Sequence, residues 1–317
     1  MRSCVLALVA LTSLSCGGEP ARRAARSAPE LRVVASDLPT TGAAAESVSG
    51  AEPEPQAEPE PAPAPAQRAL GEPLVEPERT RATVLLYHGF DRGTDPLSVS
   101  SKNFERHIEW LLASRVEIVH TSELIEFMQG KRRLSERVAV ITIDDGLRSV
   151  YERAWPILQR HGVRFTIGLP TGVMEEPKNA PVMSWDQVRE MVASGLCEVA
   201  SHGHMHRHLP KLEGRRRFEE LELSWQIIER RLGTAPVAYF YPLGAFDVRS
   251  AAEVRKVGYA AAFKATGAPI ALGSSDHFWL PRASVFYADG AHVGHFFGAR
   301  FLGQVRARPS PTARASD

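Results

Sequence analysis

The chain has 317 residues and a formal net charge of +1, with 44% hydrophobic and 8% aromatic residues. Residues 82–317 carry 30 Lys and Arg against 26 Asp and Glu, an excess too small to indicate a nucleic-acid-binding protein. Cys4 and Cys16 lie near the N-terminus, so Cys197 alone remains for a folded domain. A single cysteine excludes a disulfide within that domain, and we expect Cys197 to be a small buried residue.

The first residues resemble a secretory signal. Arg2 precedes the apolar run 5–11, which is too short to span a bilayer, and small residues lead from it to Cys16. This pattern is similar to a bacterial lipobox, although Ser13 stands where such boxes usually have leucine. We therefore expect residues 1–16 to form a signal peptide, with export and a lipid anchor on Cys16 that holds the protein to a membrane facing the periplasm or the cell exterior.

A low-complexity stretch follows the signal. Residues 17–81 are rich in Ala, Pro and Glu and contain no aromatic residue, so they cannot bury enough apolar surface to order themselves. We expect a disordered linker over 17–81, extended by its prolines. The remaining sequence predicts one α/β domain over 82–305 and a disordered tail over 306–317.

Strand-like and helix-like patterns alternate through this domain. The expected strands are 83–87, 138–143, 164–169, 198–201, 237–241, 259–264 and 283–286. The expected helices are 102–113, 150–160, 185–192, 217–232 and 248–257. Such alternation predicts a parallel sheet with helices outside it, and six or seven units predict closure into a barrel-like form.

Two motifs at predicted strand ends indicate chemistry. Asp144 and Asp145 end one apolar run and are followed by Gly146, whereas His202 and His206 follow another. One Asp and two His suit a hydrolytic metal ion, and the second Asp is then free to act as a general base. Taken singly, the first motif is also compatible with a plain turn and the second with a solvated histidine-rich loop.

Further polar residues occupy the same register along the chain. They stand at or just past the end of a predicted strand, or beside the last one: Tyr87-His88, Tyr241-Pro242 and Pro281-Arg282. Because the carboxyl ends of parallel strands share one face of a barrel, we expect these residues to meet there with the aspartates and histidines.

The order of these motifs resembles the polysaccharide deacetylase family, the NodB-homology carbohydrate esterases. The similarity runs from about residue 83 to 302 and includes Thr-Ile-Asp-Asp-Gly, Ser-His-(x)3-His, Tyr-Pro-(x)-Gly and Leu-Pro-Arg. The resemblance implies a distorted (β/α)7 barrel, a divalent metal and removal of acetyl groups from acetylated sugar polymers.

The resemblance assigns roles residue by residue. Asp145, His202 and His206 resemble the metal ligands, and Asp144 resembles the catalytic base. The metal is usually zinc in the family, although Co²⁺, Ni²⁺ and Mn²⁺ also tolerate this ligand set. His204 and His208 are expected not to be ligands.

The segment around Pro242 resembles the family's Tyr-Pro motif. The backbone N–H of Leu243 is the implied oxyanion donor, and Tyr241 and Pro242 are candidates to line the substrate site, with a core aromatic as the alternative for Tyr241. Many members carry an Arg where this chain has Phe240. Arg282 resembles an Arg that orients the base, and a surface Arg is the alternative reading.

The general acid is the least defined role. The family often uses a late histidine motif that this sequence lacks, so His88 is the first candidate, His292 or His295 the second, and the absence of a histidine acid the third.

The predicted function is an exported metal-dependent deacetylase of a cell-wall or extracellular polysaccharide, acting on N-acetylglucosamine units. Two alternatives remain, a catalytically weak glycan-binding lipoprotein and a metal hydrolase of another ester or amide. The sequence predicts no nucleic-acid partner.

Overall fold

The computed structural model describes residues 74–90, 97–178, 180–266, 270 and 276–285. The expected signal peptide with Cys16, linker residues 17–73, His292, His295 and the tail lie outside the described residues. The backbone of Leu74 forms an isolated antiparallel bridge with Ser135, so contacts with the domain begin before the expected boundary at residue 82.

The strands form one parallel sheet in the order β7-β6-β5-β4-β3-β1-β8, with β2 paired to β3 beside this path. The strands are β1 (Arg81–Tyr87), β2 (Glu117–Ile118), β3 (Arg137–Ile143), β4 (Phe165–Leu169), β5 (Cys197–Ser201), β6 (Tyr239–Phe240), β7 (Ala262–Phe263) and β8 (Ala283–Ser284). In the β1–β3 pair, Arg81 lies opposite Arg137 and Tyr87 opposite Ile143.

The two ends of this path meet. Phe263 of β7 forms a parallel bridge with Leu280, three residues before β8 begins, and the Lys264 N–H donates to the Leu280 carbonyl at 2.9 Å. Since β8 also pairs with β1, the sheet closes into a ring. The predicted distorted (β/α)7 barrel is therefore confirmed for the described residues.

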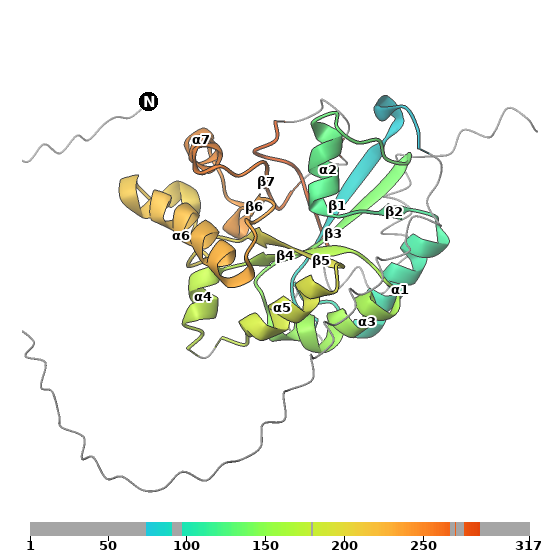
Figure 1. The fold of residues 1–317 in the computed structure, drawn as a ribbon, viewed down its shortest axis with the longest axis horizontal. Coiled ribbons are helices and arrows are strands. Elements are labelled where there is room, and N and C mark those ends of the chain that lie inside the picture. Colours follow the sequence, from blue (N-terminus) through green and yellow to red (C-terminus); the bar gives the residue numbers. More distant parts are fainter. Residues whose placement is uncertain (1–73, 91–96, 179, 267–269, 271–275, 286–317) are drawn as a thin grey trace, which may run out of the picture. The chain divides into compact units, whose positions relative to one another are not determined.

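The helices are α1 (Ser101–Ala113), α2 (Thr121–Met128), α3 (Trp155–Arg160), α4 (Thr171–Glu175), α5 (Trp185–Ala193), α6 (Gly214–Leu232) and α7 (Val248–Val257). Figure 1 shows α1, α3 and α5 below the strands, α6 and α7 to the left and α2 above. The sequence did not predict β2, α2 and α4, whose eight residues or fewer are too short to show a clear period.

One predicted helix begins irregularly. Residues Val150–Ala154 form a π-helical turn in which the Trp155 N–H donates to the Val150 carbonyl, and α3 follows directly. Pro156 has no N–H to donate, so the regular pattern of α-helical hydrogen bonds is interrupted at this residue in any case.

Alternation along the strands separates two apolar layers. One set of strand residues packs with α1, α3 and α5, as Ile141 and Ile167 do. The other set, which includes Val84, Val140 and Phe240, comes from β1, β3, β5, β6 and β7 and packs together with α2. The second set therefore fills the barrel, and residues that continue its register point inward.

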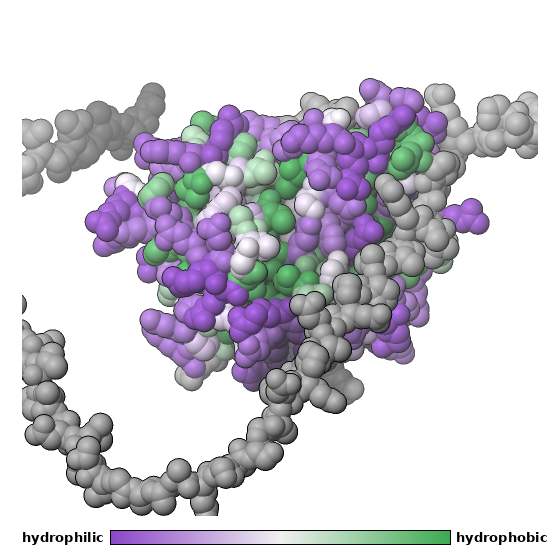
Figure 2. Space-filling view, in the orientation of Figure 1, coloured by the Kyte–Doolittle hydropathy of each residue, from purple (hydrophilic) through white to green (hydrophobic). Residues whose placement is uncertain are grey.

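Hydrophilic residues cover the periphery of the face in Figure 2, and hydrophobic residues appear toward its centre. The exposed large apolar residues in the described part of the chain are Leu74, Leu97, Met205, Leu223, Leu243 and Val248. Among the described residues, no helix has the length and apolar character needed to cross a membrane.

His107 makes folding stability depend on pH. Its ring lies in the core against Tyr87, whose hydroxyl is 3.2 Å from Nδ1, and burial lowers the pKa of His107 from 6.5 to about 4. Below pH 6.5 the unfolded chain binds a proton that the folded chain does not, so stability is lost as the pH falls from 6.5 to 4.

For this difference in pKa the loss is about 3 kcal/mol. We expect His107→Gln to remove that part of the pH dependence, because glutamine does not titrate. Urea unfolding of both proteins at several pH values between 7 and 4 measures the free energy of unfolding. An equal loss of this free energy in the two proteins as the pH falls would contradict the assignment to His107.

Candidate functional site

The register of the strands brings the candidate residues to one end of the barrel. Asp144 follows Val140 and Thr142 at intervals of two along β3, and His88 continues the inward set of β1. His202 follows Ala200 in the same way, and Arg282 follows Leu280. Asp144, His88 and His202 thus stand at the carboxyl ends of their strands, and Arg282, which directly precedes β8, reaches Asp144 with its side chain.

A tight turn lets both aspartates face this site. The Asp144 N–H continues the β1–β3 ladder by donating to the Tyr87 carbonyl at 3.0 Å. Asp145 and Gly146 then take left-handed conformations, with φ of 73° and 60°. Two consecutive residues of this kind reverse the chain, so Asp145 does not follow the strand alternation to the outside.

Asp145, His202 and His206 converge. Asp145 Oδ1 lies 3.4 Å from His202 Nε2 and 3.3 Å from His206 Nε2, and the possible ligand atoms of all three residues lie within 4.8 Å of one another. Tetrahedral ligands about 2.0–2.1 Å from one ion are themselves about 3.3 Å apart. The residues present therefore fit a divalent metal ion.

The tautomer of His202 suits a ligand. Its Nδ1 lies 2.9 Å from the carbonyl oxygen of Phe240, which can only accept, so Nδ1 carries the proton and Nε2 presents a lone pair to the site. Burial alone lowers the pKa of His202, but Asp144 and Asp145 together raise it above its usual value. In the absence of a metal, the two carboxylates thus attract a proton to this ring.

Asp144 is held by Arg282. Both side chains are buried, and the guanidinium forms a two-pronged contact of 2.8 Å from Nη1 to Oδ1 and 2.7 Å from Nη2 to Oδ2. Burial raises the pKa of Asp144, but Arg282 and His202 lower it by more than burial raises it, so the net pKa lies below the usual value. Asp144 is therefore an oriented, ionised carboxylate, 3.7 Å from His202 Nε2.

The surroundings of this pair include Thr142 and Gly168, which sequence reasoning missed, and Phe240. Arg282 also lies 3.3 Å from the Thr142 hydroxyl and 4.3 Å from the centre of the Phe240 ring. A Cβ on Gly168 would lie 2.8 Å from both Asp144 Oδ1 and Phe240 Cδ2, so only glycine fits there. Thr142, Phe240 and Gly168 each occupy an inward position of their strand, so they can be identified as neighbours of the site once the strand register is known.

Asp145 is half-buried, and its pKa is strongly lowered. Burial opposes ionisation, but the hydrogen bonds from His202 and His206 outweigh it. Since metal ligands must be deprotonated, this carboxylate is already in the form that binds a cation.

His88 is the one candidate acid among the described residues. Its Nδ1 is buried without a hydrogen-bond partner in this part of the chain. Burial lowers the pKa of His88 although Asp144 and Asp145 raise it, so the ring is close enough to sense both carboxylates and is neutral near pH 7.

The Tyr241–Leu243 segment follows β6. Tyr241 is fully buried, and its hydroxyl donates to the Phe278 carbonyl at 2.8 Å, which gives it a core position rather than one lining an open site. Pro242 is buried and begins a 3₁₀ turn. Leu243 has a φ of 58° and is 67% exposed, and its N–H lies in the first turn, where helical donors lack partners within the turn.

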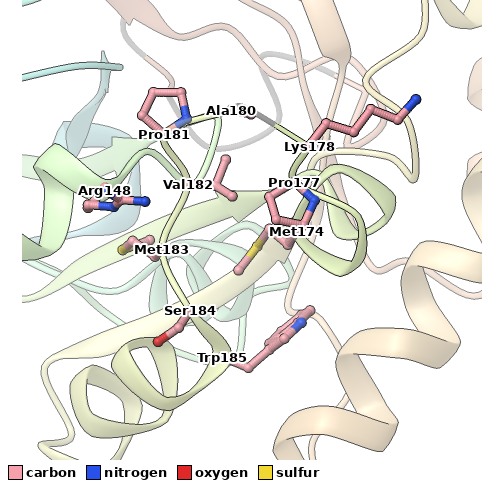
Figure 3. A pocket seen from close by; sticks show the side chains of 10 residues that line it. All are labelled: Arg148, Met174, Pro177, Lys178, Ala180, Pro181, Val182, Met183, Ser184 and Trp185. Carbon is pink, nitrogen blue, oxygen red and sulfur yellow. The ribbon is translucent and has the colours of Figure 1, made fainter.

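The described residues form a pocket of about 510 Å³ (Figure 3). Its walls belong to the segments around α4 and the start of α5, and the Met183 N–H donates to the Gly146 carbonyl at 2.9 Å. The lining residues are Arg148, Met174, Pro177, Lys178, Ala180, Pro181, Val182, Met183, Ser184 and Trp185.

The described residues contain a second group with metal-ligand atoms, formed by Glu105, Glu109 and His161. Arg160 is hydrogen-bonded to Glu105 and supplies the cation there. This group lies on the outer helices α1 and α3, away from the strand ends, so the strand-end cluster is the candidate site.

Comparison with known proteins agrees with this geometry. Residues 131–262 match the family model described as polysaccharide deacetylase. The chain is 25% identical over 176 residues to YxkH of Bacillus subtilis, a match that covers 56% of this chain and 61% of that protein. It is also 25% identical over 195 residues to a poly-β-1,6-N-acetyl-D-glucosamine N-deacetylase of Staphylococcus aureus, covering 58% of this chain and 67% of that enzyme.

Solved structures show the same fold. IcaB from Ammonifex degensii superposes with a TM-score of 0.62 at 24% identity, over 68% of this chain and 97% of that one. The Streptococcus pyogenes deacetylase PplD gives 0.61 at 18% identity, over 65% and 93%. Residues 131–262 thus match the polysaccharide deacetylase family, and the chain shares the fold of solved deacetylases.

Proposed function

We propose that this protein is a metal-dependent deacetylase that hydrolyses acetyl groups, in particular the N-acetyl groups of N-acetylglucosamine units, on an extracellular or cell-wall polysaccharide. One observation carries the proposal. Asp145, His202 and His206 converge at distances that suit a metal ion, and the ionised Asp144 lies directly beside them. The similarity to an N-deacetylase of poly-β-1,6-N-acetyl-D-glucosamine supports the substrate class.

Asp145, His202 and His206 would hold the ion, with zinc the first candidate and Co²⁺, Ni²⁺ or Mn²⁺ the others. When bound, the metal supplies Lewis-acid chemistry, which polarises the acetyl carbonyl and acidifies water. Asp144 accepts the proton of the attacking water, because each of its oxygens, although hydrogen-bonded to Arg282, still has a free lone pair. Arg282 keeps Asp144 ionised and fixes its direction.

Two further groups complete the proposed chemistry. The backbone N–H of Leu243, a residue that is 67% exposed, donates to the oxygen that gains negative charge, a role that does not depend on the leucine side chain. His88, which is neutral in the resting site, would take up the proton that Asp144 removes from water and pass it to the leaving nitrogen, since its imidazole lies within the field of both aspartates.

Acetate release tests the proposal. The full-length protein is incubated with acetylated oligosaccharides of different linkage, with and without a chelator and with zinc added back. We expect acetate release that the chelator abolishes and zinc restores, with N-acetylated substrates cleaved in preference to O-acetylated ones. Glycan binding without acetate release favours the catalytically weak alternative, and cleavage of unrelated esters alone favours the other.

Export and a lipid anchor on Cys16 remain part of the proposal. An extracellular substrate requires an exported enzyme, and the Pro-rich stretch after the signal gives an anchored domain reach. Cell fractionation of the wild-type protein and of Cys16→Ala tests this, with release from the membrane expected for the variant.

Arg282→Lys separates orientation from charge. Lysine keeps the positive charge but lacks the planar fork that contacts both oxygens of Asp144. We expect turnover to fall about 10–100-fold, as is typical when a supporting partner is lost, while the metal content per chain stays unchanged. Steady-state kinetics and metal analysis of the same sample measure this. A variant with wild-type turnover would show that Asp144 needs only a nearby cation.

A further inference from the structure

The loop that carries His206 is fastened to α6 by one buried carboxylate. Glu220 is 3% exposed, and its Oε1 accepts hydrogen bonds from the Met205 N–H at 2.8 Å and the Arg207 N–H at 3.2 Å. These two N–H groups stand immediately before and after His206. One oxygen on a packed helix therefore holds both neighbours of this proposed ligand.

His206 needs such support because of its backbone. Its φ of 53° lies in the left-handed region, which is strained for a residue with a side chain. Strained conformations persist only where the surroundings impose them. The two hydrogen bonds to Glu220 impose this one and direct the ring toward Asp145.

The same face of α6 supports the chain on both sides of His202. Ser224, one helical turn beyond Glu220, accepts a hydrogen bond from the Ser201 hydroxyl at 2.7 Å, and the Ser201 oxygen accepts from the Gly203 N–H at 3.2 Å. A Cβ on Gly203 would lie 3.0 Å from Glu220 Oε1 and 3.2 Å from the Tyr239 hydroxyl. The loop thus packs directly on the helix with little room to shift.

We propose that Glu220 is a positioning residue of the metal site, which sets the affinity for the metal by holding the Met205–Arg207 backbone so that the His206 ring meets Asp145 and His202. The inference rests on the proposed function for the presence of a metal, and it adds a determinant that lies outside the ligand set. Supporting groups of this kind typically change metal affinity about 10–100-fold when they are lost.

Two substitutions separate reach from charge. Glu220→Gln keeps an oxygen at the same distance and loses the charge, whereas Glu220→Asp keeps the charge and withdraws the oxygen by one methylene from both N–H groups. Glu229→Gln, on an exposed position of the same helix, is the matched control. Full-length proteins are stripped with chelator, and Zn²⁺ affinity is measured by competition with a chromophoric chelator. Melting in excess chelator reports the stability of the metal-free fold.

We expect Glu220→Asp to bind Zn²⁺ about 10–100-fold more weakly, and Glu220→Gln and Glu229→Gln to stay near the wild type. The affinity is referred to folded protein, so a change in melting temperature alone does not imitate the result. Equal affinity in Glu220→Asp and the wild type would overturn the inference, as would an equal loss in the aspartate and glutamine variants. A wild-type protein that binds no Zn²⁺ would instead overturn the proposed function.

Discussion

Replacing Asp144 by asparagine is expected to lower turnover about 10²–10⁴-fold, the usual contribution of a positioned general base. The three proposed ligands are untouched, so the bound metal per chain should equal that of the wild type. The variant should also be less stable by about 3–5 kcal/mol, because Arg282 then keeps a buried charge without its partner. Acetate release, metal analysis and urea unfolding measure the three effects.

A double variant separates the loss of the base from the loss of stability. Asp144→Asn combined with Arg282→Gln removes both charges, so a substantial part of the lost stability should return while turnover stays low. Recovery of turnover together with stability would show that Asp144 acts through folding and not through proton transfer. Turnover in Asp144→Asn within tenfold of the wild type would exclude the proposed base.

Replacing His206 by alanine is expected to abolish metal binding and turnover together. The His206 side chain is 29% exposed and hydrogen-bonded to Asp145, so its removal should lower the free energy of unfolding by about 1–2 kcal/mol when both proteins are metal-free. With metal at 100 times its dissociation constant, the wild type should gain about 2.7 kcal/mol that the variant does not. Melting curves with chelator and with zinc test both statements.

His204→Ala is the matched control for this loss. His204 lies two residues away, but its Nδ1 is 3.1 Å from the Thr171 hydroxyl, and it is not part of the converging group. We expect this variant to keep its metal. Metal loss in both variants would mean that the loop as a whole, and not the His206 ring, determines binding. Equal residual turnover in His206→Ala and Asp144→Asn, with metal present in both, would refute the division of labour between them.

Local patterns in the sequence were sufficient for much of the barrel. The range 248–257 was predicted as a helix and is α7, and the apolar run at 138–143 is most of β3. These elements repeat their apolar residues with a clear period. The ends of short strands were less predictable, since β6 and β7 are two residues long inside predicted strands of five and six.

The sequence by itself determined the class of fold, the candidate ligands Asp145, His202 and His206, and the adjacent Asp144, because these follow from residue type, spacing and resemblance. Only the tertiary structure decided that Arg282 forms a buried ion pair with Asp144, that Tyr241 belongs to the core, and that Glu220 holds the loop around His206. Each of these contacts joins residues that are 13 or more positions apart, or depends on which way a side chain faces. Such contacts are set by the closure of the barrel and the packing of α6, which no local pattern encodes.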